Sequence, residues 1–578
     1  MRRVFRWLAF VVALLVIGGA AAFYWVRVQR SRADLVLRGG RIITLDESMP
    51  EAPALAAREG RIVAIGSARD VEPHIGWWTR VIDLDAGALA IPGLIEGHGH
   101  FAALGEYQTG LDLLNATSWD GIVAQVAAAV ARARPGQWIV GRGWHQEKWT
   151  AVPRPSVEGF PTHASLDAVS PDNPVVLRHA SGHAAFVNAR AMALSDITRS
   201  TGDPAGGQIL KDAGGDPTGL LRETAAGLVR QGAGEPRLTD DETAARLRQI
   251  LVLADREASA NGITSFHDAG TSLDVIEQMK RMIDVGALQT RLWVMLRVDD
   301  SPPPAATLAE AKTLGYGDHH LTVRALKYTM DGALGSRGAW LLDPYADAPG
   351  SVGLPRSLDV LRQTAALAAE GGYQLAVHAI GDRASREVLN VFEDAFKTSG
   401  KIGRDLRWRV EHAQHLSAAD IPRFGQLGVI ASMQAVHATS DAPFVRGRLG
   451  DARAAGGAYV WRKLMESGAI VTNGTDVPVE RIDPIANYYA AVTRTLADGT
   501  VFYGDQTMSR LDALRAYTIR NAYAAFEDDL KGTLSPGKLA DITVLTKDIT
   551  TVPAGEIRAA KVAYTIVGGR VVYDGGAR

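Results

Sequence analysis

The chain contains no cysteine among its 578 residues. This absence excludes disulfide bonds, thiolate metal ligands and a cysteine nucleophile. It also excludes a lipid anchor on an N-terminal cysteine, so any attachment to a membrane has to be made by the polypeptide itself. The absence is compatible with an oxidising compartment but does not identify one.

The chain also lacks a surplus of positive or negative charge. The chain has 62 basic and 64 acidic residues, which gives a formal net charge of -2. Because no basic surplus is available to neutralise phosphates, nucleic acid is not expected as a partner. The composition is otherwise that of a globular protein, with 47% hydrophobic and 22% charged residues. At this length we expect one large domain and at least one smaller one.

The first 32 residues predict a membrane segment and a short linker. Residues 7–26 form an uncharged apolar run between arginines. At a rise of about 1.5 Å per residue, this run gives about 30 Å of helix, the hydrocarbon thickness of a bilayer. We interpret it as an uncleaved transmembrane helix; the alternative is a signal peptide with a cleavage site formed by Ala20 and Ala22. Either interpretation predicts export, with the chain on the periplasmic side of the inner membrane.

Both ends of the remaining chain contain short strand patterns. The segments "ADLVLRGGRIITLD" and "VAYTIVGGRVVYDGG" each have β-branched or apolar runs around a Gly-Gly turn. Residues 33–92 and 526–578 both show this strand pattern. Between them lie some 400 residues with a different pattern. We therefore predict a small β-sandwich built from both chain ends.

Residues 93–525 alternate short apolar runs with helical stretches. Each run ends in polar residues, as in "YQLAVHAI", "RWRVEHAQ" and "GAIVTNGTD". Repeated units of strand, polar tip and helix are typical of an α/β fold, and here they predict a TIM-like (β/α)8 barrel. Residues from about 135 to 230 are rich in glycine, proline and aspartate and break the alternation. We interpret them as an insertion over the barrel mouth.

Five residues with metal-binding side chains lie at the ends of such runs. His98 and His100 are two apart, so on a strand both imidazoles point to the same side. His378, His412 and Asp476 each end a separate run. Each residue alone has an ordinary explanation, such as a hydrogen-bonded polar residue or a helix cap. Because the carboxyl ends of barrel strands meet at one face, their joint placement predicts a metal site.

The motifs that carry these residues resemble those of a known family. "PGLIEGHGH", "KYTMDGALGSR", "VHAIGDRA", "EHAQH" and "NGTDVPV" are together similar to the successive motifs of the amidohydrolase superfamily, in particular amidohydrolase family 3, the YtcJ-like metal-dependent hydrolases. The resemblance extends from about Ala33 to Asp574. It implies a hydrolase that uses a metal-activated water to cleave a non-peptide carbon–nitrogen bond in a small molecule, such as a linear amide or an N-formyl compound.

The resemblance also implies a role for each matching residue. His98 and His100 would bind the more buried metal. His378 and His412 would bind a second ion or complete the first site. Asp476 would ligate the metal and act as general base toward the bound water. One or two divalent ions are therefore expected, and zinc suits these ligands, as manganese, iron and cobalt also do.

Other matches are less specific. Lys327 falls where relatives have a lysine that carbon dioxide can carboxylate and that then bridges two metals; the alternative is an ordinary lysine in a salt bridge. His183 and His437 match histidines that line the pocket in relatives, with His183 expected to orient the scissile carbonyl. The alternative for both is a hydrogen bond to the backbone. His145 occupies a position that is often acidic in relatives, and we expect it to contact substrate.

Two further residues are predicted to contact substrate. Arg337 follows the Lys327 strand, where it is expected to position the adjoining loop. Trp144 in the inserted segment would favour an apolar or aromatic substrate, whereas the alternative is that it belongs to the core. One departure from the family pattern is Glu96, which stands where many relatives have aspartate.

Two other functions remain open at this point. The same metal site would also suit an esterase, a lactonase or a dipeptidase. A protein of another class, a membrane-held binding protein with an inactive site, is disfavoured because the set of five ligands is intact. The sequence leaves the oligomeric state open, including a homodimer.

Overall fold

The computed structural model describes Trp7, Phe10, Leu15, Val16 and residues 32–576. Most of the predicted transmembrane segment, residues 7–26, lies outside these described residues. Among those that are described, no helix has both the length and the apolar character needed to cross a bilayer. The membrane segment therefore stays a prediction.

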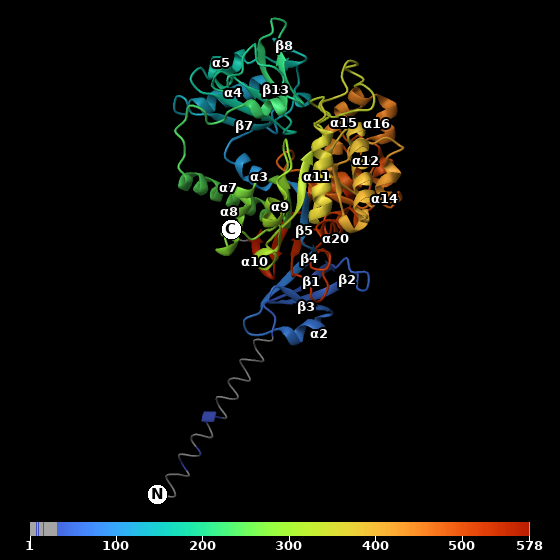
Figure 1. Cartoon of the computed structure of the whole chain (residues 1–578). Helices are drawn as coiled ribbons and strands as arrows, with labels where there is room; N and C mark the ends of the chain where they lie inside the picture. Colours follow the sequence, from blue (N-terminus) through green and yellow to red (C-terminus); the bar gives the residue numbers. More distant parts are fainter. Residues whose placement is uncertain (1–6, 8–9, 11–14, 17–31, 577–578) are drawn as a thin grey trace. The chain divides into compact units, whose positions relative to one another are not determined.

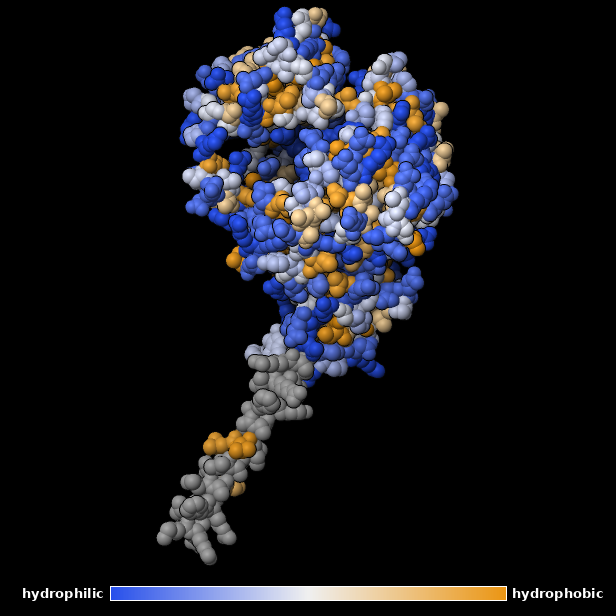
Figure 2. Space-filling view, in the orientation of Figure 1, coloured by the Kyte–Doolittle hydropathy of each residue, from blue (hydrophilic) through white to orange (hydrophobic). Residues whose placement is uncertain are grey.

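The described chain divides into two compact units. One contains the residues up to Leu94 together with those from Phe526 onward, and the other contains Ile95–Ala525. On the face drawn in Figure 2, the surface is mostly hydrophilic and apolar residues are scattered over it. Scattered apolar residues are normal on a water-exposed surface.

The first unit is built on one mixed sheet to which both chain ends contribute (Figure 1). The β1 and β4 strands are parallel, whereas the other neighbours are antiparallel. Leu35 and Leu37 in β1 enter the same apolar cluster as Ile542 and Ile566 from the C-terminal strands. The predicted sandwich is thus one continuous sheet whose two ends share a core. Its order is β24 (Arg570–Asp574), β23 (Val562–Val567), β22 (Ile542–Leu545), β4 (Arg80–Pro92), β1 (Leu35–Ile43), β2 (Glu51–Arg58) and β3 (Arg61–Gly66).

The second unit confirms the predicted α/β barrel as a nearly closed ring of eight strands. Neighbouring strands from β14 to β21 are parallel, and their residues are almost all buried. Strands covered on both faces read as continuous apolar runs, which is why the sequence pattern was recognisable. The order is β5 (Leu94–Gly99), β14 (Ile263–Thr271), β15 (Arg291–Arg297), β17 (Leu321–Thr329), β18 (Gln374–Ala379), β19 (Arg409–His412), β20 (Ile430–Met433) and β21 (Val471–Asn473).

Helices pack around these strands (Figure 1). The long α12 helix (Asp382–Ser399), for example, turns Val388, Leu389 and Phe392 inward and leaves its charged residues outside. The principal helices of this layer are α3 (Phe101–Tyr107), α7 (Asp240–Ala260), α8 (Leu273–Asp284), α11 (Leu358–Gly371), α12, α14 (Ile421–Leu427), α15 (Ala435–Leu449), α17 (Trp461–Glu466), α18 (Pro484–Thr493), α19 (Arg510–Ala516) and α20 (Ile519–Ala524).

An asparagine side chain bridges the last barrel strand to the first. The amide of Asn521 donates hydrogen bonds of 2.8 Å to the carbonyl oxygens of both Ile95 and Asn473. Farther along, the backbone N–H of Asp476 donates to the carbonyl of His98 at 2.8 Å. Gly97 lies between them with no room for a side chain, because a Cβ would be 2.4 Å from the Asn473 carbonyl oxygen. This contact brings the first and last ligand-bearing strands together.

The inserted segment forms a six-stranded sheet of its own and begins earlier than predicted. The sheet starts at Leu111 rather than near residue 135, and the helix α4 (Trp119–Val130) packs Ile122 and Val126 into the core of this sheet. Its strand order is β12 (Gly207–Lys211), β13 (Pro217–Glu223), β11 (Ala184–Val187), β10 (Val175–His179), β7 (Ile139–Trp144) and β6 (Leu111–Asp112).

Candidate metal centre

All predicted ligands lie at the carboxyl ends of barrel strands. His98 is near the end of β5, and His100 follows that strand directly. His378 and His412 occupy the ends of β18 and β19, and Asp476 follows β21 by three residues. The topology therefore gathers side chains that are far apart in the sequence at one mouth.

Three of these side chains form a cluster tight enough to hold a metal ion. One potential ligand atom from each of His98, His412 and Asp476 lies within 4.8 Å of the others. The Oδ1 atom of Asp476 is 3.5 Å from His98 Nε2 and 3.3 Å from His100 Nε2. The His378 ring lies beside the cluster, with its centroid 4.4 Å from that of His412. All except His100 are buried.

Several polar atoms of the cluster are buried without a hydrogen-bond partner. They are His98 Nε2, His378 Nε2 and Asp476 Oδ1. Buried polar atoms are nearly always paired, because leaving one unpaired costs about 1–3 kcal/mol. Nitrogen and carboxylate oxygen atoms gathered in this way are the usual donors to zinc and related ions. The residues present therefore fit a bound divalent metal.

The protonation states of the clustered side chains also suit metal binding. Burial lowers the pKa of His98, His378 and His412, and it lowers the pKa of His100 to about 4. These imidazoles are therefore neutral at physiological pH, as metal ligands have to be. Burial alone would raise the pKa of Asp476, but the imidazoles of His100 and His437, whose Nε2 atoms lie 3.3 and 3.4 Å from its carboxylate oxygens, hold this pKa well below its usual value. Asp476 is thus ionised.

Two of the ligands have strained backbone. The φ angles of His412 and Asp476 are 73° and 59°, in the left-handed region that residues other than glycine rarely adopt. Such residues cost about 1–3 kcal/mol each and concentrate at functional sites. The strain accompanies the turn by which each side chain leaves its strand and faces the barrel mouth.

A buried ion pair behind His98 was not predicted from the sequence. Glu411 accepts a hydrogen bond from His98 Nδ1, which leaves Nε2 as the nitrogen with a lone pair. Arg409 holds Glu411 through a bond of 2.6 Å and also donates to Ser432 Oγ at 2.6 Å. Burial opposes the charge of Glu411, but Arg409 and His98 lower its pKa well below the usual value. A sequence signal existed, since an arginine and a glutamate at alternate positions of one strand point to the same side.

Lys327 lies inside the barrel near these charges. It is 6% exposed, and burial lowers the pKa of its amine to about 8 even though Glu411 and Asp476 favour the charged form. A carbamate forms on the neutral amine, and burial makes that form accessible near neutral pH. Carboxylation of Lys327 stays a prediction.

The inserted segment supplies His183 to the same mouth. Its ring centroid is 4.8 Å from that of His378, and Nδ1 is 2.6 Å from Glu223 Oε2. Burial disfavours a charged imidazole, but Glu223 raises the pKa of His183 above its usual value. Since Glu223 occupies Nδ1, the Nε2 nitrogen is the one left for other contacts.

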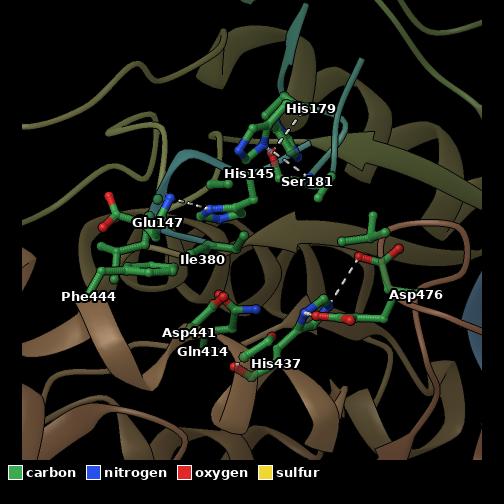
Figure 3. Close-up of a pocket in the computed structure, with 18 of the residues that line it drawn as sticks. His145, Glu147, His179, Ser181, Ile380, Gln414, His437, Asp441, Phe444 and Asp476 are labelled. Carbon is green, nitrogen blue, oxygen red and sulfur yellow. Dashed lines mark hydrogen bonds and ion pairs between the residues drawn. The ribbon is translucent and has the colours of Figure 1, made fainter. Parts of the chain in front are cut away.

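A cavity of about 780 Å³, partly open to solvent, separates the inserted segment from the barrel mouth (Figure 3). The predicted contacts His145 and His437 both line it. His437 projects from α15, and its Nε2 is 3.4 Å from Asp476 Oδ2. Further lining residues are Glu147, Lys148, His179, Ser181, His183, Ala333, Leu334, His378, Ile380, His412, Gln414, Asp441, Phe444, Asp476 and Glu480.

Two predicted substrate contacts, Trp144 and Arg337, do not line this cavity. Trp144 is fully buried and packs against Phe160 and Phe186 inside the inserted sheet, so its alternative interpretation as a core residue applies. Arg337 forms an ion pair of 2.9 Å with Asp347 and lines a neighbouring cavity. A role of Arg337 in substrate binding stays a prediction.

Comparisons with known proteins agree with this geometry. The sequence profile of the Amidohydrolase family matches residues 80–573. The chain is 33% identical to Protein LONG AFTER FAR-RED 3 of Arabidopsis thaliana, covering 94% of this chain and 92% of that protein. It is 30% identical to "Putative amidohydrolase YtcJ" of Bacillus subtilis (strain 168), covering 93% and 99%. Identity to the N-substituted formamide deformylase of Arthrobacter pascens is 26%, covering 94% and 98%.

A solved structure is similar over nearly the same length. It is an uncharacterized metal-dependent hydrolase from Pyrococcus horikoshii OT3, with a TM-score of 0.70, 25% identity, and coverage of 90% of this chain and 99% of that one. The profile match and the full-length similarity to YtcJ agree with the barrel and its ligand cluster. The chain belongs to the amidohydrolase family.

Proposed function

We propose that this chain is a metal-dependent hydrolase that cleaves a carbon–nitrogen bond other than a peptide bond, in a linear amide or an N-formyl compound. The observation that supports it most is the buried cluster of His98, His412 and Asp476 beside a cavity, in which His98 Nε2 and Asp476 Oδ1 have no hydrogen-bond partner. The relative from Arthrobacter pascens, named a formamide deformylase, supports the bond type.

The ligand set would hold one or two divalent ions, and zinc suits its imidazole and carboxylate donors. His98, His100, His378, His412 and Asp476 are the candidate ligands, with Lys327 as a further one if it is carboxylated. A bound ion of this kind supplies a water with a pKa near 7 and polarises a carbonyl group.

Three side chains would handle the substrate and the proton. Asp476 is ionised and borders the cavity, so it is suited to accept a proton from the attacking water. His437 lies 3.4 Å from the second oxygen of Asp476 and can take part in passing that proton to the leaving nitrogen. His183, with Glu223 on its Nδ1, is suited to donate from Nε2 to the substrate carbonyl oxygen.

Metal analysis combined with an activity screen tests this proposal. We expect purified full-length protein to contain one or two equivalents of a transition metal, and chelation to abolish hydrolysis of amides or N-formyl amines until zinc is restored. Esters, lactones and dipeptides belong in the same screen. Faster turnover of any of these compounds than of amides and N-formyl amines would favour the alternative function as an esterase, lactonase or dipeptidase. Protein that contains no metal after gentle purification, and no activity when metal is added, would instead indicate a binding protein.

We also propose that the chain is a single-pass protein of the inner membrane, with the barrel in the periplasm. The apolar run of residues 7–26 supports this location. We expect the full-length protein to stay in the membrane fraction after alkaline carbonate extraction, and a variant that begins at Ala33 to be released. Recovery of the intact N-terminus in the soluble cytoplasmic fraction would contradict the proposal.

A further inference from the structure

The cavity wall formed by α15 and the loop after β21 contains two carboxylates that are not candidate metal ligands. Asp441 accepts a hydrogen bond of 2.5 Å from Tyr459 Oη. Glu480 lies with Oε1 3.9 Å from His437 Nδ1. Over residues 32–576, neither carboxylate forms an ion pair with a lysine or an arginine. Among the described residues, the only basic side chain within ion-pair distance of either carboxylate is that of His437.

The nearby arginine and lysine, Arg448 and Lys148, bond to groups other than these two carboxylates. Glu147 is neutralised by Arg448 at 2.8 Å. The Lys148 ammonium donates to a backbone carbonyl, that of Leu114, at 3.1 Å rather than to a carboxylate. The His437 ring lies between Asp476 and Glu480, with Nε2 3.4 Å from Asp476 Oδ2 and Nδ1 3.9 Å from Glu480 Oε1, so Glu480 shares this ring with the metal cluster.

A buried amide on the same wall is also without a partner. Gln414 is 4% exposed and lines the cavity, and its side chain forms no hydrogen bond with any described residue. Figure 3 shows Gln414, Asp441 and His437 on the same side of the cavity. The amide oxygen and nitrogen of Gln414 are not sealed from solvent, so a ligand in the cavity can form hydrogen bonds with them. The amide is therefore available to a ligand at this wall.

An aromatic ring completes the wall. Phe444 follows Asp441 by three residues in α15, so the two side chains lie on one face of the helix. Its ring lies 5.5 Å from that of His145, at an angle of 23° between the planes. The ring faces already contact His145 and, at 5.9 Å, the Arg448 guanidinium, so Phe444 offers the apolar part of a ligand a contact beside the carboxylates.

A second metal ion does not explain the wall equally well. Within the described residues, the only group of histidine and acidic side chains close enough to hold an ion is the cluster of His98, His412 and Asp476. Asp441, Glu480 and His437 are not part of such a group. The groups on the wall therefore do not form the compact set of ligand atoms that a metal ion requires.

We propose that this wall, formed by Gln414, Asp441, Phe444 and Glu480, binds a protonated amino group of the substrate. This inference rests on the proposed function and narrows it: the substrate is an N-formyl or N-acyl compound with a second, basic nitrogen. The carbonyl to be cleaved lies at the metal centre, one imidazole (His437) away from Glu480. An anionic group at the same position would be repelled.

Three N-formyl compounds that share an unbranched five-carbon chain after the formamide nitrogen test the inference. They are mono-formylated 1,5-diaminopentane, N-formylpentylamine, which has no charge, and 6-formamidohexanoate, which has a carboxylate. We expect kcat/KM of the wild-type enzyme to be at least tenfold higher for the amine than for the neutral compound, and lowest for the acid. Pentylamine should inhibit competitively at concentrations where pentanoate does not.

The Asp441→Asn variant assigns this preference to the wall. We expect the ratio of kcat/KM for the amine to that for the neutral compound to fall about 10- to 100-fold, the usual effect of one hydrogen bond to a charged group. Asparagine keeps an acceptor for Tyr459, and Glu480→Gln, which leaves Tyr459 untouched, should lower the same ratio. The matched control is Asp451→Asn, an exposed acid in α16 (Asp451–Gly457), which should leave the ratio unchanged.

The outcomes separate the two proposals. If none of the three compounds is hydrolysed by metal-loaded enzyme, the proposed function is wrong for N-formyl amines. If all are hydrolysed with similar kcat/KM, or if Asp441→Asn and Glu480→Gln both keep the wild-type ratio, only the amine site is wrong. A higher kcat/KM for 6-formamidohexanoate than for the other two compounds would also contradict the amine site.

Discussion

Replacing Asp476 by asparagine is expected to lower kcat about 10²- to 10⁴-fold, the range associated with loss of a general base. Oδ1 of Asp476 lies 3.5 Å from His98 Nε2, and Oδ2 lies 3.4 Å from His437 Nε2. Asparagine has nearly the same size but replaces one acceptor oxygen by an NH₂ group, which cannot take a proton from water. The fold should therefore survive while turnover is lost.

Steady-state kinetics and metal analysis of the same preparation check this result. The remaining amide oxygen is still a ligand, so we expect part of the metal to stay bound and the loss in kcat to exceed the loss of metal. A matched control is Asp359→Asn, an acid with an 81% exposed side chain in α11, which should change kcat less than twofold. A fully active Asp476→Asn enzyme would show that another group accepts the proton.

The sequence contained enough information to locate the ligand cluster because two simple patterns coincide. Buried parallel strands appear as apolar runs, and the chemistry of a barrel lies where those runs end. His98, His378, His412 and Asp476 each satisfy both conditions, and they lie together in the structure. No long-range pattern had to be recognised, since the barrel topology itself gathers the strand ends.

Residues that act through a partner far along the chain were not predictable in this way. Glu411 and His98 are 313 positions apart, and nothing local in either motif indicates their contact. The hydrogen bonds from Asn521 to Ile95 and Asn473 link the first and last strands. They too join residues that are far apart in the sequence. Such contacts depend on which strands become neighbours and on the register between them. Periodicity within one segment does not contain that information.

The inserted segment limited the prediction for a different reason. Its helix α4 has the same apolar spacing as a barrel helix, so the boundary was placed near residue 135 instead of Leu111. Trp144 occupies a buried core that belongs to the insertion alone. His183, by contrast, faces the barrel mouth although no barrel strand carries it. Where a segment has its own core, composition does not separate the residues that face the cavity from those that face inward.

Arg409→Met is expected to reduce the free energy of unfolding by about 3–5 kcal/mol, the usual cost of breaking a buried ion pair from one side. Arg409 is fully buried and donates to Glu411 at 2.6 Å, to the Gly97 carbonyl at 2.8 Å and to Ser432 Oγ at 2.6 Å. Methionine fills much of the same volume but leaves Glu411 as an unpaired carboxylate inside the barrel. Urea unfolding followed by circular dichroism measures the difference.

Arg362→Met provides the matched comparison for that experiment. This arginine pairs with Asp359 on the surface of α11, and its side chain is 59% exposed. Exposed ion pairs contribute about 0.2–1 kcal/mol, so this variant should unfold near the wild-type urea concentration. A similar loss in both variants would mean that the interior pair stabilises the barrel no more than a surface pair does.

The double variant Arg409→Met with Glu411→Gln separates charge from packing. If the cost of Arg409→Met comes mainly from the stranded carboxylate, glutamine removes that charge, and the double variant should be more stable than the sum of the two single losses predicts. Glutamine still accepts a hydrogen bond from His98 Nδ1, but more weakly, so metal affinity should fall about 10- to 100-fold even where stability recovers. Strictly additive losses in stability would show instead that Arg409 acts through its contacts with Gly97 and Ser432, and that the charge of Glu411 serves only to hold His98.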